Sequence, residues 1–243
     1  MSVPPFDPGA VDALAFDVFG TVVDWRSGVI REARRLSRGK GIRIDWGAFA
    51  DAWRGKYAPS MDRVRRGEQP WTKIDDLQRA SLDELMEEFG IGLRFSDGER
   101  DELNLAWHRL PPWKDSVAGL RRLKKRYILG TLSNGNVRLL VDMARNARLP
   151  WDVIFSAETF RHFKRDPETY LGACDMLSLP PVRVMMVAAH QDDLLAAHAL
   201  GLRTAFVRRP LEFGDPAKKN LSTDPRFDLV VDGLDDLAAK LGC

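Results

Sequence analysis

Residues 15–24 read AFDVFGTVVD, an apolar run that passes into an aspartate, a glycine and a threonine. The run over 13–16 predicts a strand. Asp17 follows it directly, so its carboxylate is expected at the carboxyl end of that strand, facing a crevice. Gly20 permits a tight turn, and Thr21 places a hydroxyl close to the carboxylate. These features favour a functional role for Asp17 over the alternative that it merely caps a turn.

From residue 115 onward, short apolar runs rich in β-branched residues alternate with amphipathic stretches. The runs predict strands over 127–132, 153–155, 184–189, 204–207 and 229–231. The stretches between them predict helices at about 115–125, 136–147, 167–178, 193–200 and 234–241. This alternation predicts an α/β fold of the Rossmann type, a doubly wound parallel sheet covered by helices on both faces.

Strand signals are missing between residues 25 and 107, where apolar residues recur at spacings of three and four. That pattern predicts helices over 27–37, 46–65, 71–89 and 97–109. A helical block inserted after the first strand indicates a cap that closes over the carboxyl ends of the strands, and prolines 111 and 112 end it. We therefore expect a core domain of residues 1–24 and 111–243 and a helical cap domain of residues 25–110.

One segment of the expected core has no periodic pattern. Residues 209–227 are polar and contain prolines and a glycine. Such a composition predicts a loop, either at the rim of the site or as a simple surface connection.

Composition narrows the class of protein. The chain has 243 residues, of which 44% are hydrophobic and 30% charged, as in an ordinary soluble globular protein. Its 37 basic and 35 acidic residues leave a formal charge of +2, so we expect no nucleic-acid partner. No apolar run approaches the about 18 residues that span a bilayer, and no secretory signal is visible, so we expect neither a membrane nor an exported protein. The two cysteines, Cys174 and Cys243, lie in no metal-binding spacing, which favours a reducing, cytoplasmic location.

Three further segments with polar or charged side chains follow predicted strands. They read LSNGN at 132–136, FKRDPETY at 163–170 and MVAAHQDD at 186–193. In the second, Asp166 and Pro167 have the order typical of a helix N-cap and first helical position. Together with AFDVFGT, these four segments resemble the motifs of the haloacid dehalogenase superfamily, in the same order and over nearly the whole chain. The resemblance implies that Asp17 is a nucleophile.

Position 19 separates two branches of that superfamily. Its phosphatases carry a second aspartate two residues after the nucleophile, as general acid and metal ligand, whereas Phe19 can neither donate a proton nor bind Mg²⁺. Ala188 and Ala189 stand where the phosphatases usually have a Gly-Asp pair. Phosphoryl transfer without a cation is implausible. The chain instead resembles the metal-independent type II (S)-2-haloacid dehalogenases, so we expect neither a metal ion nor a cofactor.

The resemblance implies a role for each of several side chains. Asp17 attacks the carbon that bears the halogen and forms an ester, and the ammonium of Lys164 keeps Asp17 ionised. Arg54, in the segment AWRGKY at 52–57, and Asn134 receive the halide. The substrate carboxylate binds the Ser133 hydroxyl and the backbone amides around residues 19, 133 and 134.

Water then attacks the carbonyl carbon of the ester and releases a 2-hydroxy acid. By the same resemblance, Asp193 orients Lys164 and polarises this water. Thr21 steadies the nucleophile, and Tyr170, which we group with the substrate-binding residues, steadies the lysine.

The fourth motif departs from the family pattern. Better-known members read roughly Ser-Ser-Asn where this chain has Ala188, Ala189 and His190. An imidazole could activate water because its pKa lies near neutrality, so we place His190 among the catalytic candidates. The alternative is that His190 packs through one hydrogen bond.

Aromatic side chains near these motifs could form an apolar wall around the reacting carbon. The candidates are Phe19, Trp53, Tyr57 and Trp71, and for Trp71 a place in the core is the better interpretation.

The sequence therefore predicts cofactor-free hydrolysis of short 2-haloalkanoic acids, such as haloacetates and (S)-2-halopropionate. Its partners would be the haloacid, the released halide and, as a family expectation, a second copy of the chain in a homodimer. Two alternatives remain open. One is an atypical phosphate-ester hydrolase of the same superfamily, and the other is a non-catalytic binding protein on the same fold.

Overall fold

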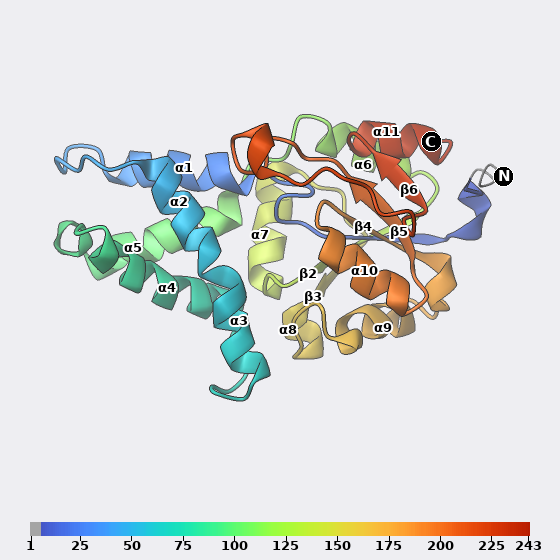
Figure 1. The fold of residues 1–243 in the computed structure, drawn as a ribbon, viewed down its shortest axis with the longest axis horizontal. Helices are drawn as coiled ribbons and strands as arrows, with labels where there is room; N and C mark the ends of the chain where they lie inside the picture. The colour runs from blue at the N-terminus through green and yellow to red at the C-terminus, as the bar shows by residue number, and fades with distance from the viewer. Residues whose placement is uncertain (1–5) are drawn as a thin grey trace.

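Six parallel strands form one sheet in the computed structural model, which describes residues 6–243 (Figure 1). In spatial order the strands are β3 (Val153–Ser156), β2 (Ile128–Ser133), β1 (Ala13–Phe16), β4 (Val184–Ala188), β5 (Arg203–Val207) and β6 (Leu229–Val231). The chain order reverses at β1, which pairs with β2 on one side and β4 on the other. The carboxyl end of β1 is thus the switch point at which open α/β sheets bind their ligands.

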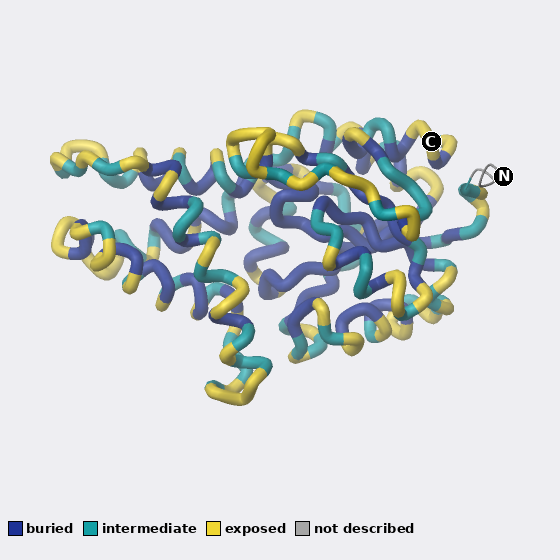
Figure 2. The backbone as a smooth tube through the Cα atoms, viewed as in Figure 1, coloured by how far each residue is buried: buried dark blue, intermediate teal, exposed yellow. Residues whose placement is uncertain are grey.

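Helices cover both faces of the sheet, and the strand residues alternate between them. Leu14 and Phe16 of β1 pack in one apolar cluster with α6 (Ser116–Leu123), α7 (Val137–Ala147) and α11 (Leu234–Lys240). Ala13 and Ala15 pack in a second cluster with α9 (Pro167–Met176) and α10 (Gln191–Ala199). Because both faces are covered, β1 and β4 are buried at every position, and Figure 2 shows the centre of the sheet dark blue. The predicted doubly wound α/β fold is confirmed.

A block of helices follows β1 and lies together at one end of the molecule (Figure 1). It contains α1 (Trp25–Leu36), α2 (Trp46–Gly55), α3 (Tyr57–Arg65), α4 (Ile74–Glu88), α5 (Asp97–Asn104) and the 3₁₀ helix η3 (Leu105–Arg109). The expectation of one continuous helix over 46–65 is wrong, since the helix breaks at Lys56. Pro59 explains the break, because it has no N–H to bond the carbonyl of Gly55 and its ring crowds that carbonyl.

Short helical turns complete the chain and have no counterpart in the sequence pattern. They are η1 (Pro8–Ala10), η2 (Gly92–Arg94), α8 (Ala157–Phe160), η4 (Pro181–Arg183) and η5 (Pro216–Lys218). Among residues 6–243, none of the helices combines the length and the apolar character that crossing a bilayer requires.

The chain enters and leaves the helical block side by side. The backbone N–H of Asp24 donates to the carbonyl of Pro111 over 2.8 Å, and Val23 bridges to Pro112. Aromatic rings continue the core across this junction, since the Trp107 ring of the block lies 6.0 Å from Phe19. The division into a core and a cap domain stays a prediction, and this junction is where it would fall.

A buried histidine joins the helical block to α7, one of the helices that cover the sheet. His108 of η3 contacts Asp75 of α4 through Nε2 at 3.1 Å and Asp142 of α7 through Nδ1 at 3.0 Å. The Asn136 side chain, before α7, donates to the same Asp75 over 2.8 Å. Burial opposes a charge on His108, but the two carboxylates outweigh it and raise the pKa of the imidazole.

We expect the contribution of His108 to stability to depend on pH. A pKa raised by folding stabilises the protein fully below the unfolded value of about 6.5, and this stabilisation is lost as the pH rises through the folded pKa. Replacing His108→Gln should therefore lower the free energy of unfolding by roughly 1.5–3 kcal/mol in mildly acidic solution and by progressively less in alkaline solution. Urea unfolding at several pH values measures the difference, with exposed His198→Gln as the control for loss of an imidazole. A difference that did not change with pH would contradict the charged bridge.

Candidate active site

Asp17 is fixed by the turn that follows β1 and by the end of β4. Its backbone N–H donates to the carbonyl of Val187 in β4 over 3.0 Å, which continues the sheet by one residue. Its Oδ2 accepts from the Thr21 hydroxyl at 2.6 Å, and that hydroxyl accepts in turn from the backbone N–H of Ala189 at 2.8 Å. Gly20, with φ of 82°, makes the turn that brings Thr21 back to the strand end.

Lys164 joins two carboxylates that come from different parts of the chain. Its Nζ lies 3.0 Å from Oδ1 of Asp17 and 2.6 Å from Oδ2 of Asp193. The Tyr170 hydroxyl donates to the other oxygen of Asp193 over 2.6 Å. The backbone N–H of Lys164 donates to the side-chain oxygen of Asn134 at 2.7 Å. The loop before α9, the first turn of α10 and the end of β1 therefore meet at one ammonium group.

These contacts set the charges of the site. Burial opposes ionisation of Asp17, but Lys164, His190 and Thr21 outweigh it and hold the pKa of the carboxyl well below its usual range. Burial also opposes the charge on Lys164, and the carboxylates of Asp17 and Asp193 reverse that effect and raise the pKa of the amine. At neutral pH the site thus holds an ionised Asp17 beside a charged Lys164.

His190 lies directly before α10, between two carboxylates. Its Nδ1 is 3.2 Å from Oδ2 of Asp17, and its Nε2 is 2.9 Å from Oε1 of Glu212. Burial lowers the pKa of the imidazole, but the charges and hydrogen bonds of Glu212 and Asp17 outweigh it and raise the pKa to about 9. His190 therefore contacts the carboxylate of Asp17, and its ring carries a proton at neutral pH.

Glu212 is a member of the site that the sequence did not identify. It lies in the loop after β5, is 0% exposed, and is paired with the ammonium of Lys219. Burial raises the pKa of its carboxyl, but His190 and Lys219 outweigh this and lower it to about 2. The segment around Glu212 has no periodic pattern, so its place next to His190 left no signal in the sequence.

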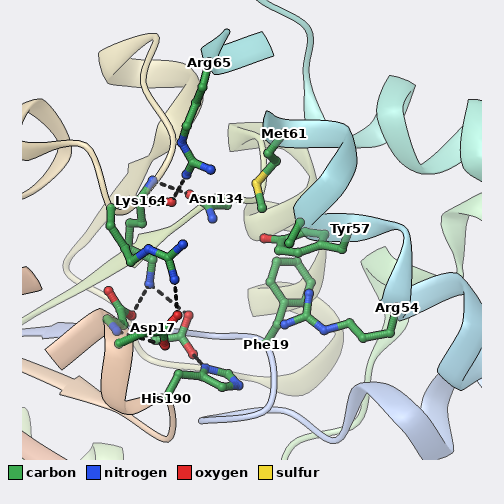
Figure 3. Close-up of a pocket in the computed structure, with 13 residues that line it drawn as sticks. Asp17, Phe19, Arg54, Tyr57, Met61, Arg65, Asn134, Lys164 and His190 are labelled. Carbon is green, nitrogen blue, oxygen red and sulfur yellow. Dashed lines mark hydrogen bonds and ion pairs between the residues drawn. The ribbon is translucent and has the colours of Figure 1, made fainter. Parts of the chain in front are cut away.

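A cavity of about 190 Å³ opens in front of Asp17 (Figure 3). It is smaller than the roughly 300–1,000 Å³ of pockets for drug-sized ligands, so it suits a small molecule. Loops and helix ends around the sheet supply charged and amide groups to its wall, and α2 and α3 supply the opposite side, including two arginines. The lining residues are Asp17, Phe19, Arg54, Tyr57, Ala58, Met61, Arg65, Asn134, Lys164, Arg165, His190, Asp192 and Asp193.

Arg54, in the last turn of α2, points its guanidinium at this cavity (Figure 3). The guanidinium lies 4.2 Å from the centre of the Tyr57 ring. Its Nη1 is buried and has no hydrogen-bond partner among the described residues 6–243. A buried N–H of a cation is normally satisfied, so this atom fits an anionic ligand.

Fewer aromatic side chains line the apolar side of the cavity than expected. Phe19 and Tyr57 line it, with their rings 6.5 Å apart and edge to face. Trp53 is 0% exposed within the helical block, where its Nε1 donates to the carbonyl of Gln78, and Trp71 packs on Phe163 at 4.6 Å. Of the four candidate aromatic residues, only Phe19 and Tyr57 line the cavity.

Two of the expected substrate-binding side chains, those of Ser133 and Tyr170, are not among the residues that line this cavity. The Ser133 hydroxyl is buried and accepts from the backbone N–H of Gly135 at 3.3 Å. The Tyr170 hydroxyl reaches the cavity only through Asp193.

Two arginines line the cavity although the sequence gave no reason to name them. Arg65 of α3 donates to the carbonyl of Lys164, and Arg165 pairs with Asp192.

Replacing Lys164→Met should damage both stability and activity. The methionine keeps most of the apolar part of the side chain but removes the ammonium group that two buried carboxylates share, and breaking a buried ion pair costs about 3–5 kcal/mol. Urea unfolding measures the stability, and turnover of the substrate proposed below measures the activity. The exposed Lys114→Met is the matched control, with an expected change within about 0.5 kcal/mol. Equal effects of the two substitutions would contradict the shared role of Lys164.

The chain is similar to one protein family and to several known proteins. A family model for haloacid dehalogenase-like hydrolases matches residues 11–201. The curated (S)-2-haloacid dehalogenase 4A of Burkholderia cepacia is 31% identical over 206 residues, which cover 81% of this chain and 83% of the relative. A solved L-2-haloacid dehalogenase structure is 46% identical, with a TM-score of 0.90, and the match covers 96% of this chain and 100% of that one. A solved defluorinating L-2-haloacid dehalogenase is 44% identical, with a TM-score of 0.89 and coverage of 99% and 100%.

Proposed function

This chain belongs to the haloacid dehalogenase-like hydrolase family, and we propose that it hydrolyses short 2-haloalkanoic acids to 2-hydroxy acids through an ester on Asp17. The observation that carries the proposal is the buried, ionised carboxylate of Asp17 at the wall of a small cavity. The names of the relatives, all haloacid dehalogenases, support the substrate class. Haloacetates and (S)-2-halopropionate are the substrates of choice because the cavity is small.

In the first step, Asp17 displaces the halide from the 2-carbon of the substrate. One carboxylate oxygen forms the C–O bond as the carbon–halogen bond breaks, and the halide leaves with the bonding electron pair. Lys164 and Thr21 hold the carboxylate in place during the attack. Phe19 and Tyr57 keep water from the reacting carbon, which strengthens the electrostatic interactions in the cavity.

The departing halide needs N–H donors in this dry setting, and we assign Arg54 and Asn134 to it. Arg54 supplies the buried Nη1 without a partner. The side-chain oxygen of Asn134 is engaged by the backbone of Lys164, so its amino group is the part that can donate to the cavity. The substrate carboxylate is assigned to the backbone amides around Phe19, Ser133 and Asn134 and to the Ser133 hydroxyl, which keeps a proton to donate.

In the second step, water attacks the carbonyl carbon of the ester, and the alcohol oxygen leaves as the hydroxyl of the product. Lys164 stabilises the negative charge that develops on the carboxyl oxygens. Asp193 orients Lys164, and Tyr170 fixes Asp193. Asp17 is regenerated with one oxygen derived from water.

Other features belong to the same proposal and rest on the family resemblance. We propose a core domain of residues 1–24 and 111–243, a cap of residues 25–110 that closes the cavity, and assembly as a homodimer. Light scattering of the purified protein tests the dimer. A reducing, cytoplasmic location is consistent with free thiols at Cys174 and Cys243.

A single turnover in ¹⁸O-labelled water tests the ester. Because the product hydroxyl comes from Asp17, the label should enter the Asp17 carboxyl and not the first molecule of product. Mass spectrometry of the peptide that contains Asp17 locates it. Label in the first product instead would mean that water attacks the substrate directly.

Replacing Asp17→Asn should abolish turnover, because an amide does not displace halide from carbon. Asp175→Asn, at an exposed position of α9, makes the same chemical change away from the cavity and should leave turnover unchanged. Halide release by both variants, measured against the unmodified protein, decides the point. Turnover retained by Asp17→Asn would remove Asp17 as the nucleophile.

A substrate panel separates this proposal from its alternatives. We expect halide from chloroacetate, bromoacetate and (S)-2-chloropropionate, with no requirement for Mg²⁺. Fluoroacetate belongs in the panel because one solved relative is described as defluorinating. Phosphate release from phosphate esters that depends on Mg²⁺ would establish the phosphatase alternative. The absence of any product would favour a binding protein.

A further inference from the structure

The imidazole of His190 has an ionisable partner on each nitrogen. Nδ1 faces Asp17 at 3.2 Å, and Nε2 faces Glu212 at 2.9 Å. Asp17 follows β1, His190 begins α10, and Glu212 comes from the loop after β5. Three distant segments therefore form a line that runs carboxylate, imidazole, carboxylate, and it ends at the proposed nucleophile. Figure 3 shows the part of this line between His190 and Asp17.

Glu212 is held more firmly than a surface carboxylate would be. Its side chain is fully buried, Lys219 is paired with one oxygen, and Nε1 of Trp25 donates to the other over 3.2 Å. The backbone makes room for it, since a Cβ on Gly20 would lie 2.2 Å from Oε1 of Glu212. Burying a carboxylate carries a desolvation penalty, so an apolar side chain would serve packing equally well or better. The charge therefore calls for a role in the site.

We infer that Glu212 is a positioning residue that holds His190 with a proton on Nε2, so that Nδ1 can take a proton from the water that hydrolyses the Asp17 ester. The inference rests on the proposed function. Glu212 accepts from Nε2–H, which leaves the lone pair of a neutral ring on Nδ1, the atom that faces Asp17. A water between Nδ1 and the ester carbonyl would then have a base on one side and its target on the other.

Formation of the ester makes His190 available as a base. In the resting site its ring faces the carboxylates of Asp17 and Glu212, with Lys164 and Lys219 behind them and Asp192 and Asp193 on its own helix. The ester removes the negative charge of Asp17, so the imidazolium loses one of its two carboxylate partners and its pKa falls. The imidazolium then gives its proton to solvent, which can reach the ring because the His190 side chain is 24% exposed.

The atoms balance over the two steps. Ester formation releases the halide and, from His190, one proton to solvent. In hydrolysis, water gives one proton to Nδ1, and the remaining hydroxide forms a bond from its oxygen to the carboxyl carbon. The bond from that carbon to the alcohol oxygen then breaks, and the remaining proton passes to the departing oxygen. The cycle restores Asp17 as a carboxylate and His190 as an imidazolium, with one haloacid and one water converted to a hydroxy acid, a halide and a proton.

Asp193 is the other candidate base, and its contacts assign it elsewhere. One of its oxygens accepts from Lys164 and the other from Tyr170, both over 2.6 Å. His190 reaches Asp17 directly, whereas Asp193 reaches it through the ammonium of Lys164.

Rapid-quench kinetics of Glu212→Gln test the inference. The variant should release about one halide per site in the first turnover at close to the normal rate, and then hydrolyse the ester at least about 10-fold more slowly. The loss should not exceed the about 10⁴-fold that general acid–base catalysis contributes. The Asp17 ester should therefore accumulate, as an added mass on the peptide that contains Asp17. The matched control is Asp215→Asn in the same loop, an exposed carboxylate that should leave both phases unchanged.

A second pair of variants shows whether Glu212 acts through His190. His190→Asn should also accumulate ester, and adding Glu212→Gln to it should slow hydrolysis little further, because the partner is already gone. Glu212→Asp, which keeps the charge, should recover part of the hydrolysis rate. If Glu212→Gln does not fold, His190→Asn and Glu212→Asp still carry the test.

Each result decides for or against the inference. Unchanged hydrolysis in Glu212→Gln would overturn it, and so would equal slowing of halide release and hydrolysis without accumulated ester. Fully additive effects of the two substitutions would also overturn it. If the unmodified protein releases no halide from any 2-haloacid, the proposed function has failed, and that result is distinct from a failure of the inference alone.

Discussion

The ammonium group of Lys164 is shared between two buried carboxylates, and the arrangement of the site depends on that sharing. Two carboxylates in one water-poor cavity repel each other and lose hydration, so without a cation at least one of them would bind a proton. Lys164 lies within 3.0 Å of both Asp17 and Asp193, and with it the pKa of Asp17 stays well below its usual range. Burial and the charge of Asp17 outweigh Lys164 at Asp193 and raise the pKa of that carboxyl. A protonated Asp17 could not displace a halide, so this contact links the electrostatics of the site directly to its proposed chemistry.

The fold brings these charges together because the chain segments that carry them end at the same edge of the sheet. Asp17 ends β1 at the switch point of the sheet, and Asp193 sits in the first turn of α10, where the helix dipole favours a carboxylate. The helical block then closes the opposite side with Arg54, Tyr57 and apolar groups. The segments around the sheet thus supply the reacting carboxylate and its partners, and the block supplies Arg54 and the opposite wall of the cavity.

The sequence predicts those parts of the structure that produce a local pattern of residues. The strands were found because burial on both faces makes them continuous apolar runs, and Asp17 was found because it follows one of them directly. The break at Lys56 was missed although Pro59 signalled it, since the apolar spacing continues through the break. Glu212 could not be found, because its burial depends on contacts with Gly20 and His190 that lie far away in the sequence. The role of the Ser133 hydroxyl at the substrate stays a prediction, since the hydroxyl accepts from Gly135 and keeps its own proton to donate.

The ionisation of Asp17 is the property that the whole account requires, and carbon-detected NMR of its labelled side chain measures it most directly. In the unmodified protein the carboxyl carbon should show no titration near the ordinary aspartate value of about 3.9, because its pKa is held well below that value. In the Lys164→Met variant the midpoint should move upward. A carboxyl in the unmodified protein that took up its proton at or above the ordinary value would contradict the account.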